Sequence, residues 1–74
     1  MNEIVNTNVI LGNNLRKLRK QQGLTLKDMA QHLDITFSVY QKYEAGNVKN
    51  VNIKIVEECA KILNVSPAEL VGWK

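Results

Sequence analysis

The chain has 74 residues and a formal net charge of +3 at pH 7, and 45% of its residues are hydrophobic. This length fits one small domain near the size at which a single core is only marginally stable, with little left over for an elaborate active site. No run approaches the ~18 apolar residues of a membrane span, the N-terminus lacks a secretory signal, and the single cysteine fits a reducing cytoplasm.

The N-terminal segment differs in composition from the rest of the chain. Residues 1–9 contain three asparagines and few helix-forming residues, which predicts a flexible arm. Over about residues 10–22, leucines recur at helical spacing, and Gly23 stands where a helix usually ends. Basic residues surround these leucines and form either a solvated face or a charged surface for a partner; Arg16 and Lys20 can add charge at a distance. The helical domain is therefore predicted over residues 10–74.

The next stretch, residues 24–46, reads LTLKDMAQHLDITFSVYQKYEAG. Thr25 can cap a first short helix, and Asp28 stands where the reciprocal partner of a capping box belongs. Thr36 can cap a second helix, which Gly46 would end. The pattern predicts two short helices joined by a tight turn.

Each of these two helices carries a narrow apolar stripe. Two helices this short cannot bury such stripes between themselves, so the flanking helices must complete the core. The predicted stripes are Met29, Ala30 and Leu33 on the first helix, and Tyr43 with either Val39 or Tyr40 on the second.

Asn52 is a predicted N-cap for a third periodic segment, a helix over residues 53–63. Cys59 lies beside its inward stripe and is predicted to be a core thiol rather than a redox group. The inward stripe itself is predicted to contain Ile53, Val56, Ala60 and Leu63.

A last helical turn is indicated by the sequence SPAEL. Ser66 suits the cap, Pro67 the first helical position, and Glu69 the reciprocal partner. Leu70 and Val71 are expected to dock this turn on the core. No segment alternates with a period of two, so the prediction is an all-α domain of five short helices.

The order of these elements resembles a known family, the Xre-type helix-turn-helix domains of phage lambda repressor and Cro. The resemblance covers roughly residues 11–71 and rests on the linked segments LRKLRKQQGLT, MAQHLDIT, YEAG and AKILNVSPAEL. It implies a five-helix, lambda-repressor-like domain. It also implies a transcriptional regulator, with repression as the expected role, that binds double-stranded DNA at a two-fold operator as a homodimer.

Some matching residues imply structural roles. Ala30 matches the small residue that lets the two motif helices approach closely, Ile35 the apolar turn residue, and Tyr43 the large residue that seats the second helix. Arg19 and Glu44 match a pair that forms a buried salt bridge in the family. A planar guanidinium can meet a carboxylate through two parallel hydrogen bonds, so such a pair fixes orientation.

The resemblance implies that the helix from Thr36 to about Ala45 enters the DNA major groove. The positions that match base-reading sites are Phe37, Ser38, Gln41 and Lys42. Phe37 departs from the family, in which this residue is usually polar. Three roles remain open for it: contact with a thymine methyl group, an anchor for a protein partner, or packing back against the core.

Phosphate contacts are expected on both sides of that helix. Thr25 and Lys27 stand at the start of the first motif helix, where free N–H groups and the helix dipole favour an anion. The family commonly has Gln where this chain has Leu26, so one side-chain contact is missing. The residues expected to hold the opposite strand are Asn47, Lys49, Asn50 and Asn52.

The sequence offers no constellation for catalysis or metal binding. His32 has no cysteine or carboxylate at metal-ligand spacing, and Glu57 and Glu58 have no partner base. We therefore expect no enzyme activity, no metal and no cofactor.

A second functional class stays open: a protein-binding module that keeps the fold and uses an apolar face around Phe37, Val39 and Tyr40. Basic flanks favour DNA over this alternative. Val71 and Trp73 are candidates for a dimer contact, although Trp73 suits the end of the core equally well. The chain can also be part of a longer regulator.

Overall fold

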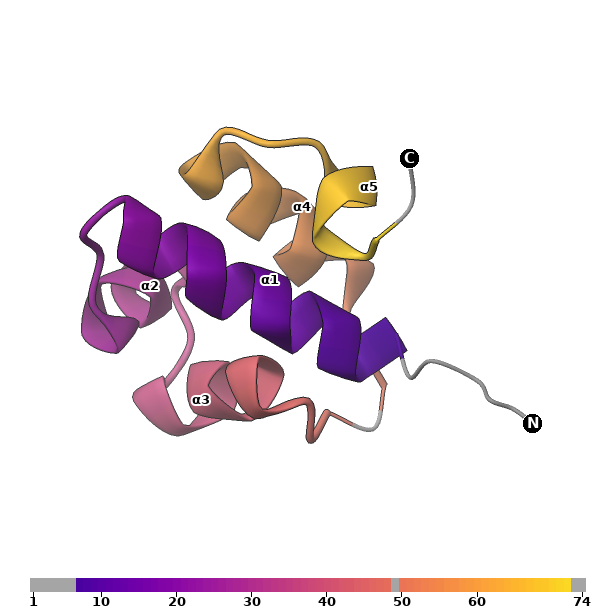
Figure 1. Ribbon diagram of the computed structural model, residues 1–74. Helices are drawn as coiled ribbons and strands as arrows, with labels where there is room; N and C mark the ends of the chain where they lie inside the picture. The colour runs from indigo at the N-terminus through magenta and orange to yellow at the C-terminus, as the bar shows by residue number, and fades with distance from the viewer. Residues whose placement is uncertain (1–6, 49, 73–74) are drawn as a thin grey trace.

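The chain forms five helices and, within the described residues, no strand. The computed structural model describes residues 7–48 and 50–72. The helices are α1 (Thr7–Gln21), α2 (Leu26–Leu33), α3 (Phe37–Ala45), α4 (Ile53–Leu63) and α5 (Pro67–Leu70) (Figure 1). The predicted all-α, five-helix fold is confirmed. No helix in this part of the chain is long and apolar enough to cross a membrane.

Four of the helices begin at the N-cap residues that the sequence predicts. The Thr25 hydroxyl accepts a hydrogen bond from the Asp28 N–H, and the Asp28 carboxylate accepts one from the Thr25 N–H, which completes a capping box. Ser66 and Glu69 form the same reciprocal pair at α5. Single side-chain caps start the other two helices, Thr36 at α3 and Asn52 at α4.

Four helices end at a residue in the left-handed conformation, which reverses the chain within a few residues. In each case the N–H of the next residue donates to a carbonyl five positions back, as Leu24 does to Arg19. Asparagine and aspartate tolerate this conformation better than other residues with a side chain, and glycine tolerates it best. The four left-handed residues are Gly23, Asp34, Gly46 and Asn64.

Helix α1 begins earlier than the sequence analysis predicts. It starts at Thr7 rather than at residue 10, so the last part of the predicted arm is helical. The Asn8 side-chain amide donates a hydrogen bond to the carbonyl oxygen of Val48, in the loop after α3. Residues 7–9 have weak helix propensity, but this contact with a segment 40 residues away favours the earlier start of α1. The rest of the predicted arm, residues 1–6, lies outside the described residues.

Buried side chains from all five helices form one core. The burial of Cys59 confirms the prediction that it is a core thiol. One predicted core residue is wrong: Ile53 is 64% exposed, because it occupies the first position of α4 and the inward stripe starts only at Val56. The buried members are Leu11, Leu15, Met29, Ala30, Tyr40, Tyr43, Val56, Cys59, Ala60, Leu63 and Leu70.

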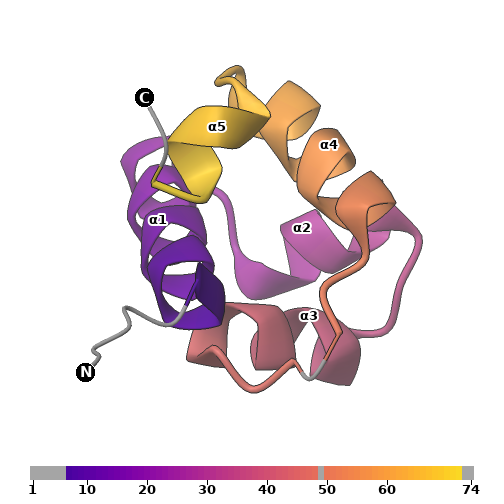
Figure 2. The ribbon, with the colours of Figure 1, turned by 90° about the vertical axis from the view of Figure 1, so that its right-hand side faces the viewer.

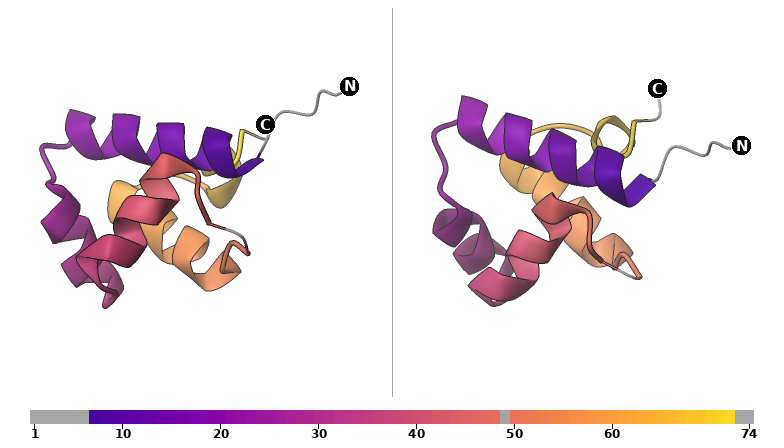
Figure 3. Two further views of the ribbon diagram at one scale, coloured as in Figure 1. Left: turned by 90° about the horizontal axis from the view of Figure 1, so that it is seen from below. Right: turned by 60° about the horizontal axis from the view of Figure 1, so that its bottom comes forward.

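In the view of Figure 1, α2 and α3 lie below α1 and α4 and α5 lie above it, and Figure 2 shows α1 at one edge of the domain, with α5 above it, α3 below it and α4 across from it. The C-terminal end of α3 comes very close to α1 at Gly12. A Cβ atom at Gly12 would lie 2.7 Å from the carbonyl oxygen of Tyr43 and closer still to that of Glu44. The absence of a side chain at Gly12 therefore sets how closely the two helices pack. Helix α3 remains on the outside of the domain (Figure 3).

Candidate nucleic-acid interface

An ion pair joins α3 to α1. Arg19 Nε lies 2.6 Å from Glu44 Oε2, and Arg19 Nη2 donates to Glu44 Oε1 at 3.3 Å. The third guanidinium nitrogen, Nη1, donates to the carbonyl oxygen of Leu24 at 2.8 Å. The structure therefore brings the two predicted partners together, with side chains only 10% and 8% exposed. The hydrogen bond to Glu44 raises the pKa of Arg19, which favours the charged guanidinium.

The inner face of α3 is formed by Tyr40 and Tyr43, which are 0% and 5% exposed. Of the two residues considered for the inward stripe, the structure thus selects Tyr40 rather than Val39. The Tyr40 hydroxyl is buried without a hydrogen-bond partner among the described residues. Burial raises the pKa of Tyr40, and the nearby Glu44 carboxylate adds to the effect. The Tyr43 hydroxyl accepts a hydrogen bond from the Asn52 N–H at 3.3 Å, which links α3 to the start of α4.

The outer face of α3 carries the four predicted base-contact residues together. Positions four residues apart on a helix are neighbours on one face, as Phe37 is to Gln41 and Ser38 to Lys42, and all four side chains are exposed. The 45% exposure of Phe37 rules out the interpretation in which this ring packs back on the core. An extended protein or a nucleic acid can reach all four side chains at once.

The apolar face expected for a protein partner is smaller than the sequence indicated. Phe37 and Val39 are 45% and 38% exposed, but Tyr40 is fully buried and cannot belong to an exposed face. The error follows from helix geometry, because Tyr40 lies one position, about 100°, around the helix from Val39.

Two shallow depressions border the outer face of α3. One has a volume of about 310 Å³ and contains Ser38, Gln41 and Lys42 together with Ala45 and Asn47. The other has a volume of about 270 Å³ and lies between α1, the start of α2 and α3. Gln41 and Ala45 line both, so α3 forms a ridge between them. The residues that line the second depression are Arg16, Arg19, Lys20, Leu26, Gln41, Glu44 and Ala45.

The second depression contains two residues absent from the predicted site. Arg16 and Lys20 stand one helical turn apart on α1, both exposed. The sequence predicts only distant charge from these two residues, but they share a depression with Gln41. Their spacing of four in the sequence indicates a common face of the helix; only the packing of α1 on α3 reveals which surface that face joins.

The residues predicted to contact phosphate near α2 are exposed, but some of their polar groups already form hydrogen bonds within the protein. Thr25 and Lys27 are both accessible to solvent at the start of α2. The hydroxyl and N–H of Thr25 take part in the capping box with Asp28. Hydrogen bonds from Thr25, the backbone one first, lower the pKa of Asp28 and favour its negative charge at this helix end.

The predicted contacts beyond α3 fall in the loop that connects it to α4. Asn47 and Asn50 are exposed, and Asn52 is exposed while its side-chain oxygen caps α4 by accepting a hydrogen bond from the Lys54 N–H. Lys49 lies outside the described residues. The structure thus leaves these three asparagines accessible to a partner.

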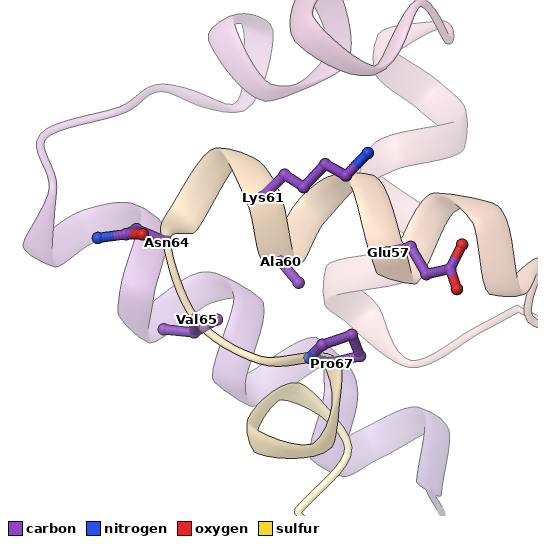
Figure 4. A pocket seen from close by; sticks show the side chains of 6 residues that line it. All are labelled: Glu57, Ala60, Lys61, Asn64, Val65 and Pro67. Atoms are coloured by element: carbon purple, nitrogen blue, oxygen red, sulfur yellow. The ribbon is translucent and has the colours of Figure 1, made fainter.

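Another cavity, of about 590 Å³, lies between α4 and the turn into α5 (Figure 4). Ala60, Val65 and Pro67 give it an apolar part, and Glu57 and Lys61 are charged residues in its lining. None of its lining residues borders either depression beside α3, and Figures 1 and 2 show α5 at the top of the domain and α3 at the bottom, so this cavity is separate from the outer face of α3. In the described parts of the chain, no group of three or more His, Cys, Asp or Glu side chains is arranged to hold a metal ion.

The residues considered for a dimer contact are at the C-terminal end. Val71 is partly buried and packs against the core, and it follows α5 directly. Trp73 lies outside the described residues. The dimer contact therefore stays a prediction.

Comparison with known proteins identifies relatives of this architecture. The crystal structure of the clp gene regulator ClgR from Corynebacterium glutamicum superposes with a TM-score of 0.83 at 24% sequence identity, over 95% of this chain and 72% of that one. The master regulator for biofilm formation SinR, in complex with DNA, gives a TM-score of 0.75 at 24% identity, over 82% of this chain and 97% of that one. A chain of the SinR–SinI complex gives 0.75 at 25% identity, over 81% and 58%.

No curated protein matched the chain. A family model described as helix-turn-helix matches residues 15–70, which extend from the middle of α1 to the end of α5. This match covers more than half of the sequence and includes both motif helices with the turn between them. The chain belongs to the Xre-type, lambda-repressor-like helix-turn-helix family.

Proposed function

We propose that this protein is a sequence-specific, DNA-binding transcriptional regulator of the cytoplasm, a repressor that binds a two-fold operator as a homodimer through α3. The observation that supports this proposal best is the form of the outer face of α3. It is a ridge of exposed side chains, with an open depression on each side and no other element of the described chain covering it.

The dimensions of B-form DNA suit this ridge. The major groove admits one α-helix, and its edges are the two phosphate backbones. With α3 in the groove, Ser38, Gln41 and Lys42 are directed to the base edges. Gln can bind adenine through two hydrogen bonds, and Lys donates to guanine. The Ser hydroxyl can hydrogen-bond with either a donor or an acceptor on a base edge. The exposed ring of Phe37 suits the methyl group of thymine.

Phosphate contacts from both sides complete the proposed complex. Thr25 and Lys27 at the start of α2 face one backbone. The loop after α3 faces the other through Asn47, Asn50 and Asn52, and we propose a contact from Lys49, which lies outside the described residues, to the same backbone. Such contacts fix the register of the protein on the duplex and carry most of the salt dependence, without reading sequence.

The family and the structural relatives support the same function. ClgR is described as a clp gene regulator, and SinR was crystallised in complex with DNA. The fold is shared with both, and we extend DNA binding and gene regulation from them to this chain. Because one such domain reads only a few base pairs, two copies on two half-sites are needed for useful affinity.

A selection of bound duplexes from a random pool is the most direct experiment. DNA binding predicts an enriched sequence, and a two-fold dimer predicts that the sequence contains two inverted half-sites about one helical turn apart. Titration of a random-sequence duplex at low and high salt adds a second criterion. Binding that is absent, or that does not weaken with salt, would contradict the proposal.

The dimer contact can be examined separately by sedimentation. We propose that Val71 and Trp73 contribute to it, since Val71 directly follows α5 and Trp73 is two positions further along the sequence. Trp73→Ala should then weaken association of the protein without lowering its melting temperature. An unchanged association constant would remove Trp73 from the interface, and a lowered melting temperature with unchanged association would assign it to the core.

One observation favours a second candidate, a protein-binding module. Phe37 and Val39 are exposed apolar residues in the first turn of α3, and aromatic side chains are enriched at protein contacts. A structural relative is a chain of the SinR–SinI protein complex. Titration of the random-sequence duplex at two salt concentrations separates the two candidates, because a module that binds only proteins should show no binding to the duplex at either concentration.

A further inference from the structure

The depression between α1 and α3 combines a predicted base-reading residue with basic side chains from another helix. Gln41 of α3 lines it, and Arg16 and Lys20 of α1 line the same 270 Å³ volume. Residues four positions apart on a helix are neighbours on one face. The side of α3 that faces α1 is therefore bordered by two cationic groups.

The charge of this depression is net positive. Arg19 also lines it, but its guanidinium is neutralised by Glu44 at 2.6 Å. Arg16 and Lys20 form no ion pair with any residue in 7–48 or 50–72, and both are exposed. Arg16 and Lys20 can therefore bind an anion. The Glu44 carboxylate is already paired with Arg19.

The start of α2 borders the same depression through Leu26 and offers an anion there less than the two cations do, apart from the contacts proposed for Thr25 and Lys27. Leu26, its first residue, provides no polar side chain, although it lines the depression. The N–H of Asp28 is occupied by the Thr25 hydroxyl, and the Asp28 carboxylate holds a negative charge beside the helix end. A carboxylate at this position offsets the attraction that a helix N-terminus otherwise exerts on a phosphate.

We propose that Arg16 and Lys20 together bind a phosphate of the DNA backbone on the α1 side of α3, in place of a contact from the first side chain of α2. This proposal rests on the proposed function. When Gln41 reaches a base edge, the backbone that borders the groove on that side lies over the depression that Gln41 shares with the two cations. Arginine can contact a phosphate through two N–H groups, and lysine adds a point charge.

Salt dependence of DNA binding separates this site from general surface charge. Each phosphate that a protein neutralises contributes about 0.9 to the slope of the logarithm of affinity against the logarithm of salt concentration. The variants are Arg16→Gln, Lys20→Gln and the double substitution. The matched control is Lys17→Gln, which removes the same charge from the same helix at an exposed residue that lines neither depression.

We expect the double variant to reduce the slope by about 0.9, because one phosphate is no longer neutralised, and each single variant to reduce it by no more than that, on a random-sequence duplex and on a selected one alike. Lys17→Gln should leave the slope unchanged, and thermal melting should be the same for all four proteins. A double variant whose slope equals that of Lys17→Gln, while the parent protein binds with clear salt dependence, would overturn the phosphate site only. A parent protein without salt-dependent binding would overturn the proposed function itself.

Discussion

Arg19 and Glu44, 25 positions apart in the sequence, meet through two hydrogen bonds in a place where both side chains are almost inaccessible to solvent. The same guanidinium also holds the carbonyl oxygen of Leu24, at the entry to α2. One side chain of α1 therefore fixes both the chain segment that leads into the first motif helix and the C-terminal part of the second.

Arg19→Ala should be strongly destabilising. It leaves the Glu44 carboxylate buried without a partner, which costs about 3 to 5 kcal/mol. Thermal or denaturant unfolding measures the loss, with Lys17→Ala on the exposed face of α1 as the control. If the melting temperature of Arg19→Ala equalled that of the parent protein, the ion pair would contribute no net stability.

The two buried tyrosines of α3 should respond oppositely to removal of the hydroxyl group. Tyr40→Phe deletes a buried hydroxyl that has no hydrogen-bond partner among the described residues, so we expect a gain of about 1 kcal/mol or more. Tyr43→Phe deletes the acceptor of the Asn52 N–H and should cost about 1 kcal/mol. Denaturant midpoints of the two variants provide the comparison. Equal losses in both would mean that the Tyr40 hydroxyl has a polar partner in solution.

Gly12→Ala should separate α1 from α3. An added Cβ meets the carbonyl oxygens of Tyr43 and Glu44, which are backbone atoms that cannot rotate away. Overpacking of this kind costs about 1 to 3 kcal/mol. Asn13→Ala, at the next, exposed position of the same helix, is the control and should change stability little. A Gly12→Ala variant as stable as the Asn13→Ala variant would show that the two helices can shift without loss.

Cys59 should react only when the protein unfolds. Burial raises the pKa of its thiol to about 12, with a smaller effect from Glu44 and Glu58, so the reactive thiolate is nearly absent at neutral pH. A thiol reagent followed by absorbance should react slowly with the native protein and rapidly in denaturant. Equal rates in the two conditions would contradict the buried assignment.

Because the pKa of Cys59 is raised, the stability of the protein should fall at alkaline pH. The unfolded chain releases this proton near the ordinary cysteine pKa of about 8.5, whereas the folded chain retains it up to about 12. The folded state therefore binds more protons in this interval, and the free energy of unfolding falls as pH rises through it. Cys59→Ala should lose less stability than the parent protein over the same interval, measured by denaturant titration.

Lys42 and Lys61 should differ in their effect on DNA recognition. Lys42 lies on the outer face of α3, and Lys61 lies on α4, 3.6 Å from Glu58. Lys42→Ala should reduce discrimination at one base pair by about 1 to 3 kcal/mol, and Lys61→Ala should leave affinity and specificity unchanged. Titration against a selected duplex and its single-base-pair variants measures both. A uniform loss over all duplexes with Lys42→Ala would assign this lysine to phosphate instead.

Local chemistry made much of the fold predictable from the sequence. The caps at Thr25, Thr36 and Ser66 depend on residues within three positions, and the turns at Gly23 and Gly46 depend on glycine. The residues that form each of these features are close together in the sequence, so the sequence pattern is sufficient to predict the feature. The Arg19–Glu44 pair came from family resemblance, because nothing local links two residues so far apart.

The features that sequence analysis missed depend on contacts between distant segments. The early start of α1 involves the hydrogen bond from Asn8 to Val48, and Ile53 is exposed because it occupies the first position of α4, before the buried stripe that starts at Val56. The proposed role of Arg16 depends on the packing of α1 on α3, which places Arg16 and Gln41 around one depression. None of these is encoded in residue spacing along one helix.

The two faces of α3 have different roles, one in packing and one at the exposed surface. Tyr40, Tyr43 and Glu44 hold it in the domain, and none of them belongs to the exposed set of Ser38, Gln41 and Lys42. Substitutions in the exposed set therefore leave the packing of the helix intact. A library that varies only these three positions should yield folded proteins with altered operator preference, so the domain is a suitable starting scaffold for reprogrammed DNA binding.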